Sequence, residues 1–195
     1  MIIGLTGGTG VGKSKASQFF SKWGFEVIDY DKITYEIYTP ESQCMKEIKS
    51  EFGNKILNKD QSLNRKALGD IVFADKDALK KLNNIVYKYI LAYTKDKIDN
   101  SNGKKLLLDA PTLFEAALNE KCDFVVGIIA DKELRLKRIM ERDGIDEKTA
   151  LNRINSQKDD DFYIKNCDYI IDNSSDVKSL EDKLMEILNK MGITK

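Results

Sequence analysis

The chain has 195 residues, of which 42% are hydrophobic and 33% charged, enough apolar material for one substantial core and a small second lobe. Its 32 basic residues balance its 32 acidic residues, so no whole-molecule positive field would hold it on nucleic acid or on an anionic membrane. Histidine is absent, which excludes an imidazole general base, a Ser-His-Asp triad and every histidine metal site. Acid and base chemistry must therefore come from carboxylates or lysines.

The N-terminus and the cysteines indicate the compartment. The chain enters its first apolar run at residue 2 without a basic leader, and no apolar run reaches about 18 residues. We therefore expect a cytoplasmic protein that has neither a membrane nor a nucleic acid as partner. Cys44, Cys122 and Cys167 are odd in number and form no CxxC pair, so we expect small buried thiols rather than disulfides or a zinc cluster.

Short apolar runs alternate with long stretches of helical periodicity. The predicted strands are residues 2–6, 26–29, 106–109, 124–130 and 169–171. The helical pattern is clearest over residues 78–93 and 177–191. Strands this short and apolar favour a parallel sheet covered by helices on both faces, which binds its ligands at the carboxyl ends of the strands.

The second and third strands are separated by about 75 residues with helical or turn patterns, far more than one crossover needs. We therefore expect a helical insertion over residues 32–103. Residues 1–31 and 104–195 would then form the core, in which the charged helical segment 132–165 follows the fourth strand.

A phosphate-binding motif lies between the first strand and the first helix. Residues 7–14 read Gly-Gly-Thr-Gly-Val-Gly-Lys-Ser and fit the pattern GxxxxGK[ST]. The glycines let successive amides face one anion, and the helix N-terminus adds partial positive charge. We expect Lys13 to bridge the β- and γ-phosphates and the Ser14 hydroxyl to ligate Mg²⁺. The alternative, a merely flexible glycine turn, does not explain the full pattern with its strand and helix flanks.

Carboxylates follow two of the predicted strands. Asp29 and Asp31 stand at i and i+2, on the same side while the strand persists, and Asp31 is the first choice to accept a proton from an attacking hydroxyl. The alternatives are that Asp31 caps the next helix, and that Asp29 contacts a metal or ribose or makes a strand-end hydrogen bond. Asp109 ends an apolar strand as a Walker B carboxylate does, although many buried strands end this way.

Arginine is concentrated in one segment of a chain that mostly uses lysine. Arg135, Arg138 and Arg142 are spaced by three and four residues, which places them on one helical face. The guanidinium fork matches phosphate oxygens, so we interpret residues 132–165 as a lid over the γ-phosphate, with Arg135 furthest from its tip. The alternative is ion pairing within the helix to a neighbouring carboxylate, that of Glu133, Glu141 or Asp143.

These features favour a small-molecule kinase. The nearest match to the guanine-reading NKxD signature is residues 58–61, which lack the final Asp and do not follow an apolar strand, so a GTPase is disfavoured. A helical insertion with an arginine-rich lid suits closure over a small acceptor. Another nucleoside or nucleotide kinase, and a non-catalytic nucleotide-binding regulator, remain the alternatives.

From end to end the sequence resembles the dephospho-coenzyme A kinase family. The matching segments are residues 4–8 leading into the motif, 27–31, 63–65 with 71–73, 82–83 with 85, 109–111 with 113–115, Arg138, Arg142, Gln157, and 168–171 with Asn173. The resemblance implies an α/β P-loop NTPase fold, with a five-stranded parallel sheet flanked by helices, a helical acceptor-binding insertion and an arginine-rich lid. It also implies transfer of the ATP γ-phosphoryl group to the ribose 3′-hydroxyl of dephospho-coenzyme A. We expect Mg²⁺ as the cofactor, and a monomer or small homo-oligomer.

The resemblance also implies roles for individual residues. The catalytic residues would be Lys13, Asp31, Arg138 and Arg142. ATP would be bound by Gly8, Thr9, Gly10, Val11, Gly12, Lys13, Ser14, Lys15 and, near the adenine, Asn173. Separately, we expect the acceptor to be bound by Asp29, Arg65 and Asp109, and the metal by Ser14 of the motif and by Asp109 as a Walker B-like carboxylate. Tyr87-Lys88 stands where the family usually has His-Pro.

Overall fold

The computed structural model of the chain describes residues 1–175 and 177–193. The strands are β1 (Ile2–Gly7), β2 (Glu26–Asp29), β3 (Leu106–Asp109), β4 (Phe124–Ile129) and β5 (Tyr169–Asp172). The helices are α1 (Lys13–Lys22), α2 (Tyr30–Ile37), α3 (Gln43–Phe52), α4 (Arg65–Ala74), α5 (Lys76–Asp99), α6 (Lys132–Asp143), α7 (Glu147–Asn155), α8 (Asp160–Asn166) and α9 (Val177–Lys190). Short 3₁₀ turns occupy η1 (Asn54–Ile56) and η2 (Leu118–Lys121).

The chain divides into two compact units. One unit comprises residues 1–28 and 101–195 and holds the sheet, and the other comprises residues 29–100 and is helical. The sequence placed the insertion at 32–103, so the helical unit begins and ends three residues earlier than expected. Within the described ranges 1–175 and 177–193, no helix combines the length and hydropathy that a membrane span needs.

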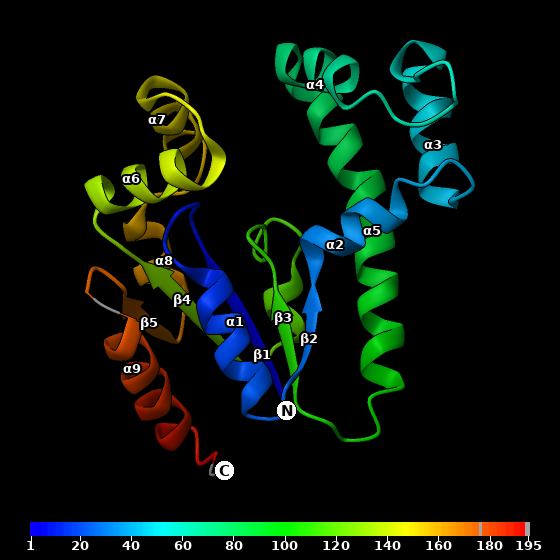
Figure 1. The fold of residues 1–195 in the computed structure, drawn as a ribbon. Helices are drawn as coiled ribbons and strands as arrows, with labels where there is room; N and C mark the ends of the chain where they lie inside the picture. Colours follow the sequence, from blue (N-terminus) through cyan, green and yellow to red (C-terminus); the bar gives the residue numbers. More distant parts are fainter. Residues whose placement is uncertain (176, 194–195) are drawn as a thin grey trace. The chain divides into compact units, whose positions relative to one another are not determined.

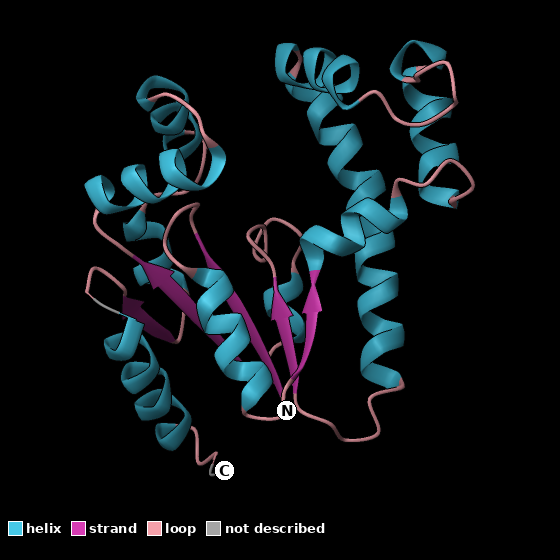
Figure 2. Ribbon diagram, in the orientation of Figure 1, coloured by secondary structure: helices cyan, strands magenta, loops and turns pink. Residues whose placement is uncertain are grey.

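The sheet is five-stranded and parallel, in the order β2-β3-β1-β4-β5 (Figures 1 and 2). β1 lies between β3 and β4, with Ile2 opposite Leu106 and Ile3 opposite Phe124. After β1 the chain moves toward one edge of the sheet, and after β4 it moves toward the other. Such a reversal leaves a crevice at the carboxyl ends of the strands, and the glycine-rich segment begins there.

Helices cover both faces of the sheet because its strands are apolar on both sides. On one face α1 and α9 pack against a buried cluster from the strands: Ile3, Leu5, Leu107, Val126, Ile128 and Ile171. The opposite face is tightly packed at two glycines. A Cβ on Gly4 would lie 2.8 Å from Leu113, and a Cβ on Gly127 would lie 2.7 Å from Cys167.

The helical unit has a core and helix caps of its own. Its buried residues include Met45, Ile48, Leu68, Leu82, Val86 and Ile90. The side chains of Ser42, Asn64 and Asp75 accept hydrogen bonds at the starts of α3, α4 and α5. The longest helix, α5, extends beyond the predicted 78–93 at both ends, because its apolar stripe stops before the helix does and polar residues continue it to Asp99.

Candidate active site

The segment from Gly7 to Lys13 forms a phosphate-binding loop (P-loop) between β1 and α1. The backbone is left-handed at Gly10 and Gly12, where φ is 79° and 96°, values that glycine adopts without strain. α1 begins at Lys13, directly after Gly12, and among the described residues no side chain caps its N-terminus. The unbonded amides of such a helix start, together with its partial positive charge, suit an anion.

Lys13 and Asp109, both singled out in the sequence, meet in the structure. Lys13 Nζ donates a hydrogen bond to Asp109 Oδ1, and the two side chains are 15% and 9% exposed. Asp109 is the last residue of β3, the strand beside β1, so the two neighbouring strand ends bring the charges together. The pair places a lysine and a carboxylate at the mouth of the P-loop.

Three side chains hold the carbonyl groups of the P-loop. Arg135 Nε donates to the Thr9 carbonyl oxygen at 3.0 Å. Arg138 Nη1 donates to the carbonyl oxygens of Gly10 and Val11 at 3.3 and 3.5 Å. Asn173 Nδ2 also donates to the Val11 carbonyl, at 2.7 Å. Consecutive carbonyls of the loop are therefore bound by α6 and by the residue that follows β5.

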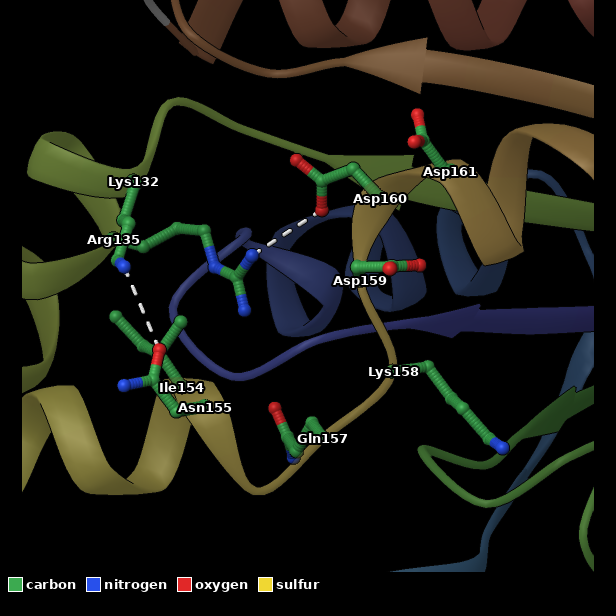
Figure 3. A pocket seen from close by; sticks show the side chains of 9 residues that line it. All are labelled: Lys132, Arg135, Ile154, Asn155, Gln157, Lys158, Asp159, Asp160 and Asp161. Atoms are coloured by element: carbon green, nitrogen blue, oxygen red, sulfur yellow. Dashed lines mark hydrogen bonds and ion pairs between the residues drawn. The ribbon is translucent and has the colours of Figure 1, made fainter.

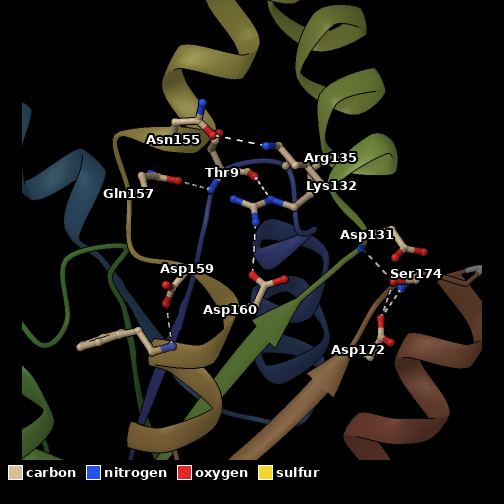
Figure 4. A network of polar contacts seen from close by, with 12 residues as sticks. Thr9, Asp131, Lys132, Arg135, Asn155, Gln157, Asp159, Asp160, Asp172 and Ser174 are labelled. Carbon is tan, nitrogen blue, oxygen red and sulfur yellow. Dashed lines mark hydrogen bonds and ion pairs between the residues drawn. The ribbon is translucent and has the colours of Figure 1, made fainter.

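The loop between α7 and α8 contacts the P-loop from another direction (Figure 4). Gln157 Oε1 accepts a hydrogen bond from the Thr9 amide at 2.6 Å. Arg135 Nη1 donates to Asp160 Oδ1 at 3.2 Å, so Arg135 joins α6, the P-loop and the start of α8. Partial burial raises the pKa of the Asp160 carboxyl, although the positive charge of Arg135 opposes this rise.

A cavity of about 520 Å³ lies beside this network (Figure 3). Its lining combines cations, amides and carboxylates: Lys132, Arg135, Ile154, Asn155, Gln157, Lys158, Asp159, Asp160 and Asp161. Figure 3 shows the guanidinium of Arg135 between Asp160 on one side and Gln157 on the other. The cavity is therefore continuous with the P-loop partners and is not a separate cluster.

The three arginines of α6 do not behave alike. Arg135, expected to lie furthest from the lid tip, is buried, because its side chain turns onto the P-loop. Arg142 is 59% exposed and donates twice to Asp143, at 2.7 and 2.9 Å. The hydrogen bonds from Arg142 lower the pKa of the Asp143 carboxyl. The contact of Arg142 with a phosphate stays a prediction.

The two carboxylates after β2 have different local roles. Asp29 caps α2, since its Oδ1 accepts from the amides of Asp31 and Lys32 at 3.1 and 3.2 Å. Asp31 lies in the first turn of α2. The premise that both carboxylates lie on one side of a strand is wrong, because the strand ends at Asp29 and α2 begins at Tyr30. The capping considered for Asp31 is thus performed by Asp29.

Arg65, the predicted acceptor ligand of the helical unit, stacks on tyrosines of α2. Its Cζ lies 4.2 Å from the ring centroid of Tyr35 and 5.4 Å from that of Tyr38. Tyr35 is 66% exposed. Tyr38 is more buried, and this burial raises the pKa of its phenol to about 12. Arg65 is exposed at the start of α4, so its charge is accessible to a ligand.

The residues predicted to bind a metal suit Mg²⁺ that is shared with substrate phosphates. They do not suit a metal ion enclosed by protein ligands alone. Within residues 1–175 and 177–193, no group of three or more acidic or thiol side chains could enclose a metal. Ser14 is exposed in the first turn of α1 and supplies a hydroxyl, and Asp109 at the end of β3 supplies a carboxylate. Mg²⁺ prefers oxygen ligands and is commonly held by few protein groups together with substrate phosphates.

The sequence missed the partners of Arg135 and Gln157. Gln157 was noted for its resemblance but given no role, and Arg135 was counted only in the arginine group proposed to contact phosphate, furthest from the lid tip. A signal was present for the arginine, because a chain that favours lysine uses arginine where a fixed fork of donors is needed. For Gln157 we find no such signal, since its contact depends on how residues 156–159 connect α7 to α8.

Comparison with known proteins identifies close relatives over nearly the whole chain. A sequence profile described as dephospho-CoA kinase matches residues 1–179. A Fusobacterium nucleatum protein named dephospho-CoA kinase is 40% identical over 184 residues, which are 94% of this chain and 95% of that protein.

Solved structures agree with this match. A Thermus thermophilus protein is 26% identical, with a TM-score of 0.83 and coverage of 98% of this chain and 97% of that one. A dephospho-CoA kinase from Campylobacter jejuni is 30% identical, with a TM-score of 0.68 and coverage of 97% and 96%. The similarity therefore includes both units of the fold.

Proposed function

Because this chain belongs to the dephospho-CoA kinase family, we propose that it transfers the γ-phosphoryl group of ATP to the ribose 3′-hydroxyl of dephospho-CoA. The products are CoA and ADP, and the reaction completes CoA synthesis. The observation that carries this proposal is the P-loop, whose Lys13 opens α1 in a chain matched along nearly its full length. The fold is that of P-loop kinases, and the activity is that of an ATP-dependent kinase.

In the proposed ATP site, residues 8–15 surround the phosphates. The P-loop amides that are not already engaged donate to them, whereas the Thr9 amide donates to Gln157. Lys13 would exchange its partner Asp109 for phosphate oxygens when ATP binds, because both partners compete for one ammonium group. Asn173, buried beside the Val11 carbonyl, is proposed to contribute at the adenine end. Mg²⁺ held by Ser14 and Asp109 would neutralise charge on the phosphate oxygens.

We assign proton acceptance to Asp31. The acceptor hydroxyl forms a bond to the γ-phosphorus while the bond from that phosphorus to the β–γ bridging oxygen breaks, and the hydroxyl proton passes to the Asp31 carboxylate. Support comes from the chain itself, since Asp31 follows β2 by two residues and β2 belongs to the sheet whose central strand leads into the P-loop. Asp29, already engaged in capping, is better suited to hold this turn in place.

The helical unit is proposed to receive dephospho-CoA. Arg65 has the chemistry for this task, since a guanidinium pairs readily with a phosphate of the acceptor while remaining stacked on Tyr35. Asp29 and Asp109 are the further predicted acceptor contacts. Arg138 and Arg142 are proposed to act on the transferring group, Arg142 directly because its guanidinium is accessible.

An acceptor panel tests the function. ADP release is measured with ATP and Mg²⁺ in the presence of dephospho-CoA, adenosine, AMP or shikimate, with Lys13→Ala as the control for P-loop dependence. We expect turnover with dephospho-CoA and far less with the fragments, because remote binding energy orients the reacting hydroxyl. Equal turnover on adenosine or AMP would favour a nucleoside or nucleotide kinase. No ADP release with any acceptor would favour a nucleotide-binding regulator.

A further inference from the structure

We propose that Arg135 is a positioning residue of the P-loop, which fixes the peptide planes whose amides bind the phosphates of ATP. The inference deepens the proposed ATP site and rests on it. Arg135 touches no reacting atom in this assignment. It acts through the backbone between Thr9 and Gly10, to which it is hydrogen bonded.

The first argument is the burial of Arg135. Its side chain is 5% exposed, and the carboxylate that pairs with it, on Asp160, is itself 38% exposed. Nη2 is buried and has no hydrogen-bond partner in the part of the chain that the structure describes. Burying a guanidinium with incomplete pairing costs free energy, so stability does not explain an arginine here. A role in placing the loop does.

The second argument is the geometry of the peptide bond. In a trans peptide the carbonyl of one residue and the amide of the next lie in one plane and point in opposite directions. A donor that binds the Thr9 carbonyl therefore also orients the amide of Gly10. Gly10 adopts a left-handed φ of 79°. Because glycine is conformationally free, the peptide before it could otherwise rotate readily.

The neighbouring peptides follow the same rule. Arg138 binds the carbonyls of Gly10 and Val11, so it orients the amides of Val11 and Gly12. Arg138 Nη2 also donates to the Asn173 carbonyl at 3.2 Å, which ties this arginine to the end of β5. Two arginines one turn apart on α6 thus hold consecutive carbonyls, and the amides of the same peptides point to the opposite side.

The third argument is the close approach at Gly8. A Cβ at this position would lie 2.5 Å from Arg135 Nη2 and 3.2 Å from its Cζ. The φ of Gly8 lies outside the left-handed region, so its backbone would accept other residues. A side chain at residue 8 would therefore require the Arg135 guanidinium to shift. The sequence attributed all of the glycines to curvature of the backbone, and Gly8 is an exception.

The closing experiment measures binding and does not depend on the acceptor. Affinities of Arg135→Lys and Arg135→Ala for ATP, ADP and AMP are determined by calorimetry or competition, with Arg153→Lys as the matched control. Arg153 is an exposed arginine of α7 that donates to Asp143. We expect ATP and ADP to bind roughly ten- to a hundredfold more weakly in the Arg135 variants, the loss for one misoriented donor to a charged group. AMP, which has no β-phosphate, should bind as in the wild type.

Kinetics and one coupled substitution complete the test. KM for ATP should rise in Arg135→Lys while kcat at saturating ATP changes less than about threefold. Gly8→Ala should cause the same selective loss, and should cost little more when combined with Arg135→Ala, because the obstructing guanidinium is then absent. Additive losses, or equal weakening of ATP and AMP, would overturn the proposal. If Arg135→Ala fails to fold, Arg135→Lys and Gly8→Ala decide it. Absence of kinase activity in the wild type would reject the proposed function and leave these binding results to stand.

Discussion

Substitution of Arg142 by lysine tests whether the accessible arginine of α6 acts on the transferring phosphoryl group. In the structure the Arg142 side chain is 59% exposed, and its guanidinium donates to its chain neighbour Asp143. Exposed ion pairs contribute at most about 1 kcal/mol, and Arg153 still donates to Asp143 after the change. We therefore expect the free energy of unfolding of Arg142→Lys to fall by less than about 1 kcal/mol.

The expected catalytic effect is larger than the effect on stability. If the guanidinium leaves Asp143 for the γ-phosphoryl group, lysine loses the planar fork, and kcat should fall roughly ten- to a hundredfold, about 1.4 to 2.7 kcal/mol in activation free energy. Arg138→Lys should behave differently, because the Arg138 guanidinium donates to the carbonyls of Gly10 and Val11 in the P-loop. We expect it to raise KM for ATP as well as to lower kcat.

The assay is steady-state ADP release at saturating ATP and dephospho-CoA, run beside thermal or denaturant unfolding of each variant. Arg153→Lys is the control, because it shares the partner Asp143 and has no proposed role in phosphate binding. Wild-type kcat in Arg142→Lys, at unchanged stability, would refute the phosphate contact. Arg142 would then be a surface residue paired with Asp143.

Three further outcomes are expected from single residues. Asp31→Asn removes basicity at nearly constant size, so kcat should fall roughly 10²-fold with KM for ATP little changed; near-normal kcat in the same assay would reject Asp31 as the base. Burial raises the pKa of Cys122 and Cys167 to about 12, so at pH 8 about one thiol in ten thousand is ionised and iodoacetamide should label the native protein far more slowly than the unfolded chain. Labelling of the folded protein at the rate of a free thiol would contradict this. Gly127→Ala should lower the free energy of unfolding by about 1–3 kcal/mol, because its Cβ would crowd Cys167. Urea unfolding measures the change. The control is Gly69→Ala, on helix α4 with its nearest neighbour at 3.5 Å, which should not lower stability.

The strands were predictable because each is a short apolar run with both faces covered. β2 and β3 have the predicted bounds, and β1, β4 and β5 differ by one residue at their carboxyl ends. The P-loop was predictable because its glycines and Lys13 occupy fixed places between a strand and a helix. Both signals are local in the sequence, and neither requires knowledge of distant contacts.

The interior of the site could not be read in the same way. Helical spacing places Arg135, Arg138 and Arg142 on one face, but it does not state which of them turns toward the P-loop. That depends on where α6 begins after β4, a matter of tertiary packing. Likewise, Asp29 caps α2 because the helix begins at Tyr30, directly after a strand whose end was predicted correctly. A shift of one residue at that boundary changes which carboxylate caps the helix.

The balance of charge in the site explains how a chain without net charge can bind a triphosphate. Lys13 is neutralised by Asp109, and Arg135 is paired with Asp160, so their formal charges are already partly offset. What the P-loop adds is oriented amides, which carry no net charge and whose dipoles are fixed by bonds on their carbonyl side. Orientation is a property that composition does not record, since exchanging the arginine that holds a carbonyl for a lysine leaves the net charge the same. Affinity for phosphate should therefore follow the geometry behind the loop more closely than the number of cations near it.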